Sequence, residues 1–145
     1  MTNPKVLFLC TANSARSQMA EALLRKQAGD RFDVYSAGLE PTQVHPYAMK
    51  VMAEIGIDMA GHRAKGVGEF LGTMNPAYVI IVCEKARQRC PTAFPATGAT
   101  IIAWPIDDPA GAVGGEEARL GKFREARDQI EARIKAWLDA LGSGQ

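Results

Sequence analysis

The sequence predicts an α/β fold: a single-domain three-layer sandwich in which helices cover both faces of a four-stranded parallel sheet. Strand patterns are mostly separated by helical patterns, which favours parallel pairing of the strands. The chain has 145 residues, the size of one domain, and 47% of them are hydrophobic, enough for one full core. We assign residues 1–141 to this domain and residues 142–145 to a frayed tail.

The first half of the chain alternates strand and helix patterns. A continuous apolar run, typical of a buried strand, is followed by apolar residues at helical spacing that stop before Gly29. An alternating segment that closes at Gly38 indicates the second strand. Pro46 is well placed to open the second helix, which stops at Gly56. In order, these elements are expected at residues 6–9, 17–28, 32–36 and 46–55.

The second half supplies two more strands and a long terminal helix. Val67, Phe70 and Leu71 suit a short helix. The unbroken, β-branched run YVIIVC is typical of a strand covered on both faces, and a fourth strand ends near Pro105. Apolar residues at helical spacing then continue almost to the end of the chain. These two strands and the last helix are expected at residues 78–83, 100–106 and 120–141.

Composition excludes several classes of protein. The chain has 17 basic and 16 acidic residues, whereas binders of nucleic acids or membrane surfaces carry a charge excess. No apolar run approaches the ~20 residues that cross a bilayer, and the run before Cys10 is too short for a signal peptide. We expect a cytoplasmic protein, monomeric and without nucleic-acid or membrane partners. Three cysteines, an odd number, argue against a framework of structural disulfides.

Reactive side chains fall at the ends of three predicted strands. Cys10 and Cys83 each end a strand, and the pair Asp107–Asp108 follows the fourth. Open parallel sheets bind ligands beyond the carboxyl ends of their strands, where the strand order reverses. The topology therefore predicts a functional site at this edge of the sheet.

Residues 10–17, Cys-Thr-Ala-Asn-Ser-Ala-Arg-Ser, connect the first strand to the first helix. Such a loop aims backbone N–H groups at one point, and the helix N-terminus adds partial positive charge. Arg16 adds a planar fork of donors that suits a tetrahedral oxyanion. These groups favour the thiolate of Cys10, to which Ser17 can donate a hydrogen bond. The residues expected to bind the anion are Thr11, Ala12, Asn13, Ser14, Ala15 and Arg16.

Each of these residues also has a plainer interpretation. Cys10 alone would more often be a small buried side chain, and Arg16 a solvated residue of the first helical turn. A cation at a helix N-terminus opposes the helix dipole, however, so a bound anion would explain Arg16. Asn13 tolerates left-handed backbone, and we expect it mainly to fix the shape of the loop.

The segment Cys10–Glu21, CTANSARSQMAE, resembles the active-site segment of the thioredoxin-coupled arsenate reductases. That family shares the fold and loop of the low-molecular-weight protein tyrosine phosphatases. The resemblance covers nearly the whole chain and implies reduction of arsenate to arsenite, for arsenic detoxification. The other segments that carry it are Val34–Gly38, His45–Pro46, Gly56–Asp58 with His62, Cys83–Pro91 and Asp107–Ala110.

The resemblance implies a relay of three thiols. Cys10 attacks arsenate, Cys83 attacks Cys10 and releases arsenite, and Cys90 then attacks Cys83. Thioredoxin reduces the final disulfide, with glutaredoxin and glutathione as the alternative external reductant. We expect no bound cofactor and no metal, because a zinc site would need a fourth ligand. Phosphate and sulfate are tetrahedral, as arsenate is, and are expected to occupy the same loop.

The spacing of Cys83 and Cys90 bears on that disulfide. At positions i and i+7 of a helix, the two residues share a face but lie roughly 10 Å apart along the axis. A disulfide needs Cα atoms within about 7 Å of each other. We therefore predict that residues 84–99 rearrange when the bond forms. The plainer interpretation is two ordinary thiols.

Asp108 is the expected general acid. Pro109 biases it toward extended backbone, and its place before a proline resembles that of the family's acid. Asp107 is expected to form or cap the turn. His62 either hydrogen-bonds the residues around the loop or is a packing histidine.

Asn13, Glu21 and Ser36 resemble positions that hold a potassium ion in some family members. Arg63 and Lys65 depart from that pattern, because they place cations where oxygen ligands are expected. Either a fixed positive side chain replaces the metal and pairs with Glu21, or both cations are exposed to solvent.

Two loop positions also depart from the family. Ala12 stands where many relatives carry glycine, so its backbone must suit an L-residue. Ala15 stands where several relatives carry another cysteine. That change removes a side disulfide within the loop but leaves the three thiols of the relay.

Two other functions stay open at this point. A low-molecular-weight tyrosine phosphatase would use Cys10, Arg16 and Asp108 without further thiols. It would usually have aromatic side chains near the Asp-Pro turn, where this chain has residues 110–112, Ala-Gly-Ala. A non-enzymatic oxyanion sensor or redox adaptor would leave the nucleophile unexplained.

Overall fold

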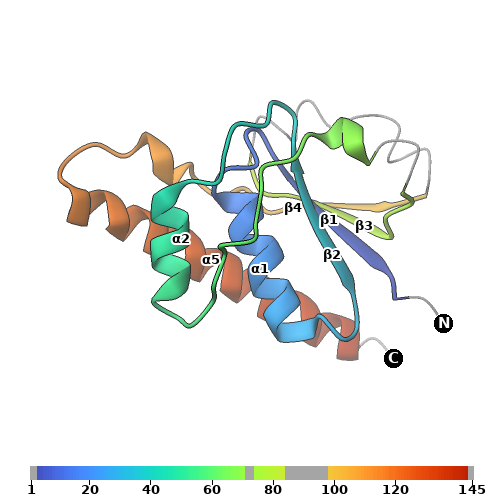
Figure 1. Ribbon diagram of the computed structural model, residues 1–145. Coiled ribbons are helices and arrows are strands. Elements are labelled where there is room, and N and C mark those ends of the chain that lie inside the picture. The colour runs from blue at the N-terminus through green and yellow to red at the C-terminus, as the bar shows by residue number, and fades with distance from the viewer. Residues whose placement is uncertain (1–2, 71–73, 84–97, 144–145) are drawn as a thin grey trace.

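The computed structural model describes residues 3–70, 74–83 and 98–143 (Figure 1). Its centre is a four-stranded sheet in the order β2-β1-β3-β4, in which all the neighbouring strands are parallel. The predicted α/β class and parallel sheet are confirmed. The strands are β1 (Lys5–Cys10), β2 (Asp33–Gly38), β3 (Tyr78–Ile81) and β4 (Thr100–Ala103).

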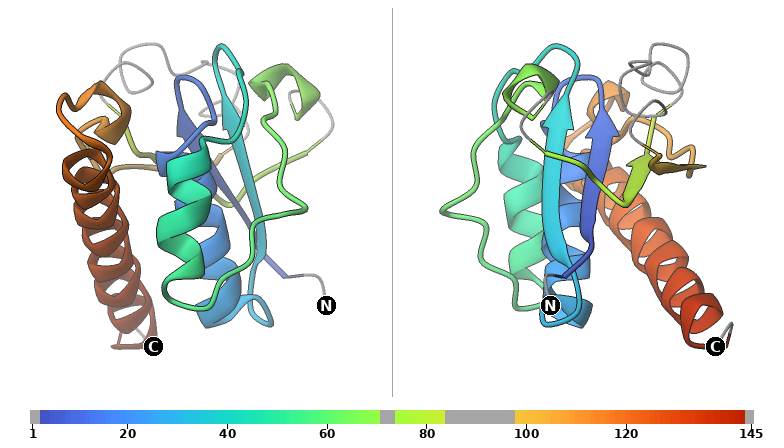
Figure 2. Two further views of the ribbon diagram at one scale, coloured as in Figure 1. Left: turned by 60° about the vertical axis from the view of Figure 1, so that its left-hand side comes forward. Right: turned by 90° about the vertical axis from the view of Figure 1, so that its right-hand side faces the viewer.

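In the described part of the chain, three α-helices pack together on one face of this sheet, as the left view of Figure 2 shows. Short 3-10 helices flank the sheet's carboxyl edge, and the first of them lies on the opposite face. The helices are α1 (Arg16–Ala28), α2 (Pro46–Ala53) and α5 (Glu116–Ser143), and the 3-10 helices are η1 (Val67–Glu69) and η2 (Pro109–Gly111).

Successive side chains of β1 point to opposite faces of the sheet, and both faces are covered, which explains the unbroken apolar run. The ring of Phe8 lies 6.2 Å from that of Trp104, which in turn meets Trp137 of α5. The next residue back, Leu7, points to the opposite face, where its register partner Tyr35 meets Phe70. Leu7 and Phe8 are both fully buried, because the sheet is covered on both sides.

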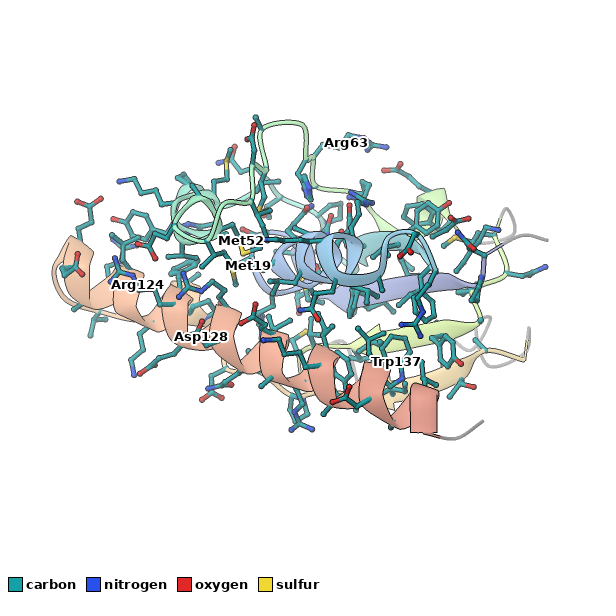
Figure 3. All side chains as sticks on the ribbon, turned by 90° about the horizontal axis from the view of Figure 1, so that it is seen from below. Met19, Met52, Arg63, Arg124, Asp128 and Trp137 are labelled. Atoms are coloured by element: carbon teal, nitrogen blue, oxygen red, sulfur yellow. The ribbon has the colours of Figure 1, made fainter. Side chains whose placement is uncertain are left out.

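The helical layer combines apolar packing with ion pairs at its rim. Met19 of α1 and Met52 of α2 are fully buried within it. Arg124 of α5 donates to Glu54, which follows α2, at 2.8 Å (Figure 3 shows Met19, Met52 and Arg124). Packing within this layer and against the sheet fixes the position of α1, whose N-terminus follows the predicted anion loop.

Both strands at the reactive edge are shorter than predicted. β3 ends at Ile81, two residues before Cys83, and β4 ends at Ala103 instead of residue 106. The hydrogen bonding of the ladder nevertheless continues, from Trp104 N–H to the Ile81 carbonyl at 2.8 Å. A last, longer bond follows Pro105, from Ile106 N–H to the Val82 carbonyl at 3.3 Å.

The last helix is longer than the apolar pattern indicates. α5 begins at Glu116, four residues before the predicted start, because Glu116 and Glu117 favour a helix N-terminus without adding to the apolar stripe. It runs through Gly142 and Ser143, so the first half of the predicted tail is helical. No proline interrupts the backbone hydrogen bonding there. Residues 144–145 and Leu71 of the predicted short helix lie outside the described residues.

The strand order places two reactive loops side by side. β1 leads through α1 to β2 on one side, whereas its other neighbour, β3, leads toward β4. The predicted reversal of strand order thus falls between β1, which ends at Cys10, and β3, which Cys83 follows by two residues. Within the described ranges, no helix is long and apolar enough to cross a membrane.

Candidate active site

The loop after β1 is shaped by a second backbone segment that runs along its outer side. Four carbonyls of the loop accept N–H groups from residues 39–45, at distances of 2.8 to 3.1 Å. The pairs are Cys10 with Leu39, Thr11 with Glu40, Ala12 with Thr42 and Ser14 with His45. The C=O and N–H of one planar peptide point in opposite directions. The N–H groups of residues 11, 12, 13 and 15 are therefore turned inward, as an anion site requires.

Close packing of this loop against β2 requires a glycine. A Cβ on Gly38 would lie 2.7 Å from both the Asn13 nitrogen and the Thr11 carbonyl oxygen. Asn13 has φ 50°, the left-handed backbone predicted for it, and is the one non-glycine residue with positive φ in the described part of the chain. Ala12 keeps a negative φ, as expected of an L-residue. The sequence pattern predicted only the end of a strand at Gly38 and gave no sign of this packing role.

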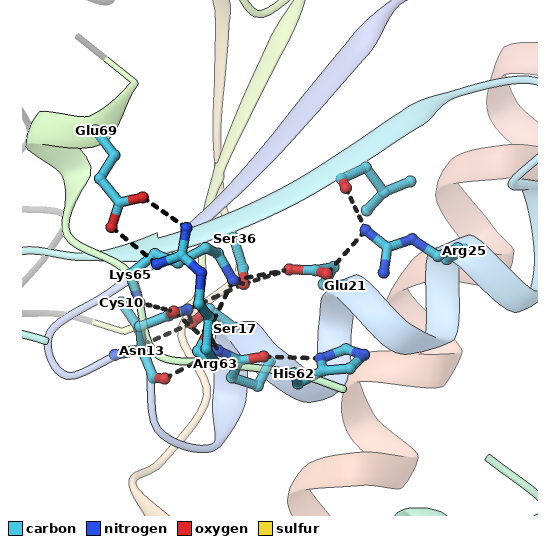
Figure 4. A network of polar contacts seen from close by, with 12 residues as sticks. Cys10, Asn13, Ser17, Glu21, Arg25, Ser36, His62, Arg63, Lys65 and Glu69 are labelled. Carbon is cyan, nitrogen blue, oxygen red and sulfur yellow. Dashed lines mark hydrogen bonds and ion pairs between the residues drawn. The ribbon is translucent and has the colours of Figure 1, made fainter. Parts of the chain in front are cut away.

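The sulfur of Cys10 is buried and receives donors from two directions. Asn13 N–H donates to it at 3.2 Å, and Ser17 Oγ lies 2.8 Å away (Figure 4). Ser17 Oγ also accepts from Asn13 Nδ2 at 2.8 Å, which directs the serine's own hydrogen toward the sulfur. Hydrogen bonds to the charged form favour that form, so this arrangement stabilises a thiolate.

The N-terminus of α1 adds a favourable field to this sulfur. Its N-cap, Ala15, makes no side-chain cap, and the first turn has no acidic residue. The partial positive charge of the helix end is therefore left for an anion in the loop.

A buried polar chain leads away from Asn13 beneath the loop. Asn13 Nδ2 donates to Ser36 Oγ at 3.0 Å, and Ser36 Oγ donates to Glu21 Oε1 at 2.5 Å. Glu21 also pairs with Arg25 at 2.8 Å. The structure thus brings together the predicted supporting residues Asn13, Glu21 and Ser36.

Gln18 and His62 hold the other side of the Asn13 amide. Gln18 Nε2 donates to Asn13 Oδ1 and to the Arg63 carbonyl, both at 2.8 Å. Its Oε1 therefore faces His62 Nδ1, which donates to it at 2.9 Å. Burial lowers the pKa of His62 below its ordinary value, which favours the neutral ring. Of the two interpretations of His62, the structure fits the one in which it hydrogen-bonds the residues around the loop. Gln18 is fully buried, but the sequence did not single it out, because a glutamine is common at any position of a helix.

The two cations of residues 63 and 65 have different surroundings. Lys65 Nζ lies 3.0 Å from the Arg63 carbonyl, 3.3 Å from Ser36 Oγ and 3.5 Å from Glu21 Oε1, and its side chain is 13% exposed. The Arg63 side chain is 67% exposed and pairs with Glu69 on the surface (Figures 3 and 4). Each of the two alternatives left open by the sequence therefore holds for one residue: the side chain of Lys65 points inward and pairs with Glu21, and that of Arg63 is exposed to solvent.

The loop forms one wall of a cavity of about 520 Å³, which also holds the second thiol. Cys83 is buried, and its Sγ lies 3.4 Å from Thr11 Oγ1. The cavity is lined by Cys10, Thr11, Ala12, Ser14, Ala15, Arg16, Thr42, Cys83, Pro105, Ile106, Asp107, Asp108 and Ala110. Both described thiols, the arginine and both carboxylates thus share one space.

Arg16 connects this loop to the opposite wall. Its Nη1 donates to the Ile106 carbonyl at 2.9 Å, and its Nη2 lies 3.9 Å from Asp108 Oδ2. Asp108 has the extended backbone predicted before Pro109 (φ −72°, ψ 109°), and its side chain is 55% exposed. Asp108 itself caps the turn, because it accepts from Ala110 N–H at 3.0 Å, whereas Asp107 was expected to form or cap it. Asp108 is the carboxylate that directly precedes the short helix, which places it at the cap position.

One predicted participant is not placed. Cys90 and the rearrangement predicted for residues 84–99 lie outside the described residues, apart from residues 98–99. Among the described side chains, no group of three or more His, Cys, Asp or Glu is arranged to hold a metal ion. The placed groups are a loop with inward N–H groups, Arg16, two thiols and two carboxylates around one cavity.

The family follows from this geometry and from comparison with known proteins. The model of the low molecular weight phosphotyrosine protein phosphatase family matches residues 5–145, and the chain belongs to that family. An arsenate reductase of Halalkalibacterium halodurans is 43% identical over 138 residues, which cover 94% of this chain and 97% of the relative. The resemblance to arsenate reductases is thereby confirmed.

Solved structures agree with this assignment. A structure of an arsenate reductase in the phosphate binding state matches with a TM-score of 0.80 and 31% identity, over 94% of this chain and 98% of that one. The thioredoxin-dependent arsenate reductase of Corynebacterium glutamicum matches with a TM-score of 0.72 and 26% identity, over 99% of this chain and 64% of that one.

Proposed function

We propose that this protein is a cytoplasmic arsenate reductase that uses its own thiols as the source of electrons. The observation that carries the proposal is the second thiol in the cavity: Cys83 is buried beside Thr11, two residues after β3, the strand that pairs with that of Cys10. A phosphatase has no use for a thiol there. A reductase needs one, because reduction of arsenate requires two electrons that a thiol pair can supply.

Cys10 starts the reaction as the nucleophile. The inward N–H groups and Arg16 hold arsenate, and the Cys10 thiolate attacks arsenic as one As–O bond breaks. Asp108 donates a proton to the departing oxygen, which leaves as water. The product is a sulfur–arsenic adduct on Cys10, with arsenic still in its oxidised state.

Cys83 then carries out the reduction. Its thiolate attacks the Cys10 sulfur, the sulfur–arsenic bond breaks, and its electron pair stays on arsenic, which leaves as arsenite. The two sulfurs have lost two electrons and form a disulfide. Cys90 next attacks Cys83, which frees the Cys10 thiolate and leaves a Cys83–Cys90 disulfide.

Thioredoxin is the proposed reductant of that last disulfide. Dependence on thioredoxin is stated for the Corynebacterium glutamicum relative, and an internal disulfide is the kind of bond that a dithiol reductant reverses. Arsenate is the proposed substrate, and phosphate or sulfate would occupy the same loop without being reduced.

Steady-state oxidation of NADPH tests the proposal. With arsenate, we expect turnover when thioredoxin and its reductase are supplied, and no more than a trace when glutaredoxin and glutathione replace them. Cys83→Ser and Cys90→Ser should each abolish this turnover.

Hydrolysis of p-nitrophenyl phosphate supplies the control, because it requires Cys10 but neither of the other thiols. Both serine variants should therefore retain whatever phosphatase rate the wild-type protein shows. Arsenate turnover by either variant would contradict the relay. Efficient phosphatase activity without any arsenate reduction would instead favour the phosphatase alternative.

A further inference from the structure

The ammonium of Lys65 occupies a closed polar site beneath the anion loop. An ammonium has three N–H donors, and three oxygens surround this one: the Arg63 carbonyl, Ser36 Oγ and Glu21 Oε1. The cation is thus fully matched, although its side chain is almost buried. It does not touch the cavity, so the reaction steps above do not use it.

We propose that Lys65 is a positioning residue: its backbone N–H and its ammonium together set the direction of a hydrogen-bond chain that ends on the Cys10 sulfur. The proposal rests on Cys10 as the nucleophile of the proposed function, but not on which oxyanion Cys10 attacks. It predicts that removing the ammonium weakens the thiolate without removing any group that contacts the substrate.

The direction of the chain follows from counting donors at Ser36. Its oxygen accepts from Lys65 Nζ and from Asn13 Nδ2, so both of its acceptor sites are filled. The hydroxyl hydrogen is then left for Glu21 Oε1, where the 2.5 Å contact lies. Without the ammonium, one acceptor site of Ser36 is empty, and the hydroxyl is free to turn.

Asn13 transmits this direction to the sulfur. Its Oδ1 accepts from Lys65 N–H and from Gln18 Nε2, both at 2.8 Å, which fixes the orientation of the amide. Its Nδ2 therefore donates to both Ser36 Oγ and Ser17 Oγ, and Ser17 is left to donate to Cys10. Lys65 thus contacts the chain twice, through its backbone N–H and through its ammonium.

Charge balance supports the same role. Glu21 is buried and faces two cations, Arg25 at 2.8 Å and Lys65 at 3.5 Å. Burial lowers the pKa of Lys65, and the neighbouring carboxylate opposes that change. The remaining titratable groups that act on Lys65 or on this carboxylate are Arg63 and His62. Without the Lys65 ammonium, Arg25 would be the one remaining cation of the two that pair with Glu21, the carboxylate that accepts from Ser36.

The pH dependence of Cys10 alkylation tests the proposal without arsenate. In the Cys83→Ser, Cys90→Ser background, Cys10 is the one thiol, and iodoacetamide reports its thiolate. Lys65→Met keeps the length of the side chain and removes the charge. We expect the midpoint of the alkylation profile to rise by about one pH unit, the effect of losing one hydrogen bond to a charged group. Lys26→Met removes an exposed lysine and should leave the midpoint unchanged.

Chemical rescue separates positioning from simple packing. Lys65→Ala should raise the midpoint and leaves room for a small cation, so ammonium chloride should reverse part of this rise, whereas tetramethylammonium chloride at the same ionic strength should not. Ser36→Ala breaks the same chain and should raise the midpoint even if the Lys65 variants fail to fold.

Each of these results has a defined meaning. A folded Lys65→Met protein with an unchanged alkylation midpoint would overturn the proposal, and so would an unchanged midpoint in Ser36→Ala. If the wild-type protein did not reduce arsenate but the midpoint shifts were as expected, the proposed function would fail and the role of Lys65 would stand.

Discussion

The two walls of the cavity are built in different ways. The residues of the wall 10–17 are buried or half-buried, and four of the wall's carbonyls accept hydrogen bonds from the segment 39–45. On the opposite wall, Asp108 is more than half exposed and meets the loop through the long 3.9 Å contact with Arg16. The proposed nucleophile is thus held in a loop fixed by backbone hydrogen bonds, whereas the proposed acid stands on an exposed turn. Preorganisation is needed most where charge develops, at the sulfur and the anion.

Arg16 joins the two walls, and its replacement should have the largest effect. Arg16→Lys keeps the charge but loses the planar fork for the anion and the donor to the Ile106 carbonyl. We expect kcat/KM for arsenate to fall about 10³-fold, the upper range for a donor to a developing oxyanion. Steady-state kinetics with thioredoxin measures this loss. A change of less than tenfold would mean that Arg16 holds the wall without binding the anion.

Asp108→Asn tests the exposed wall directly. The amide can still accept from Ala110 N–H and cap η2, so the turn should be retained while the proton is lost. We expect kcat to fall about 10²-fold, the lower range for general-acid catalysis, because solvent reaches this side chain. Asp107→Asn is the matched control and should change kcat much less. Equal losses in both variants would contradict the assignment of the acid.

Gly38→Ala tests the buried wall through its packing. The new Cβ would lie 2.7 Å from two backbone atoms of the loop, which must shift by a few tenths of an ångström. We expect kcat/KM to fall about tenfold, since catalysis is sensitive to small displacements of a positioned nucleophile. Gly61→Ala, where a Cβ meets nothing within 4 Å, is the control. An equal kcat/KM in the Gly38→Ala and Gly61→Ala variants would show that the loop is less rigid than its hydrogen bonds indicate.

The smallest expected effect is a pH dependence of stability through His45. Burial, assisted by Arg119, lowers the pKa of His45 below its ordinary value of 6.5, against an opposing effect of Asp108. The unfolded chain therefore takes up the proton first, so stability is full above pH 6.5 and decreases as the pH falls through 6.5.

A substitution at the same position checks this pH effect. His45→Asn keeps an acceptor for Tyr47 N–H, the cap of α2, and removes the titration. Thermal unfolding at pH 7.5 and pH 5.5 should show a smaller loss of Tm for the variant than for the wild-type protein. An identical loss of Tm in the two proteins would show that His45 does not cause the pH dependence of stability.

The comparison of the walls also shows what a sequence can predict. Cys10, Arg16 and Ser17 were found because a strand, a loop and a helix follow one another with side chains that suit an anion. Asn13 was placed correctly because few residues tolerate left-handed backbone. These inferences need only local chemistry, and the parallel sheet needs only the order of the elements.

The rest depends on contacts between distant segments. Gly38 and Gln18 were missed, because their roles arise from the approach of β2 and of residues 63–65 to the loop. Lys65 and Arg63 have the same charge and lie two residues apart, so spacing alone did not separate the buried cation from the exposed one. The sequence did not show that Asp108 caps η2, because Asp107 and Asp108 have the same side chain and differ only in their position along the backbone.

A single turnover without any external reductant tests whether the protein's own three thiols supply the electrons for arsenate reduction. The fully reduced protein, which has three thiols, is mixed with excess arsenate, and arsenite and remaining thiols are counted. The account predicts one arsenite per chain and one remaining thiol, with Cys83 and Cys90 joined in a disulfide. No arsenite, or arsenite formed only after a second thiol compound is added, would contradict it.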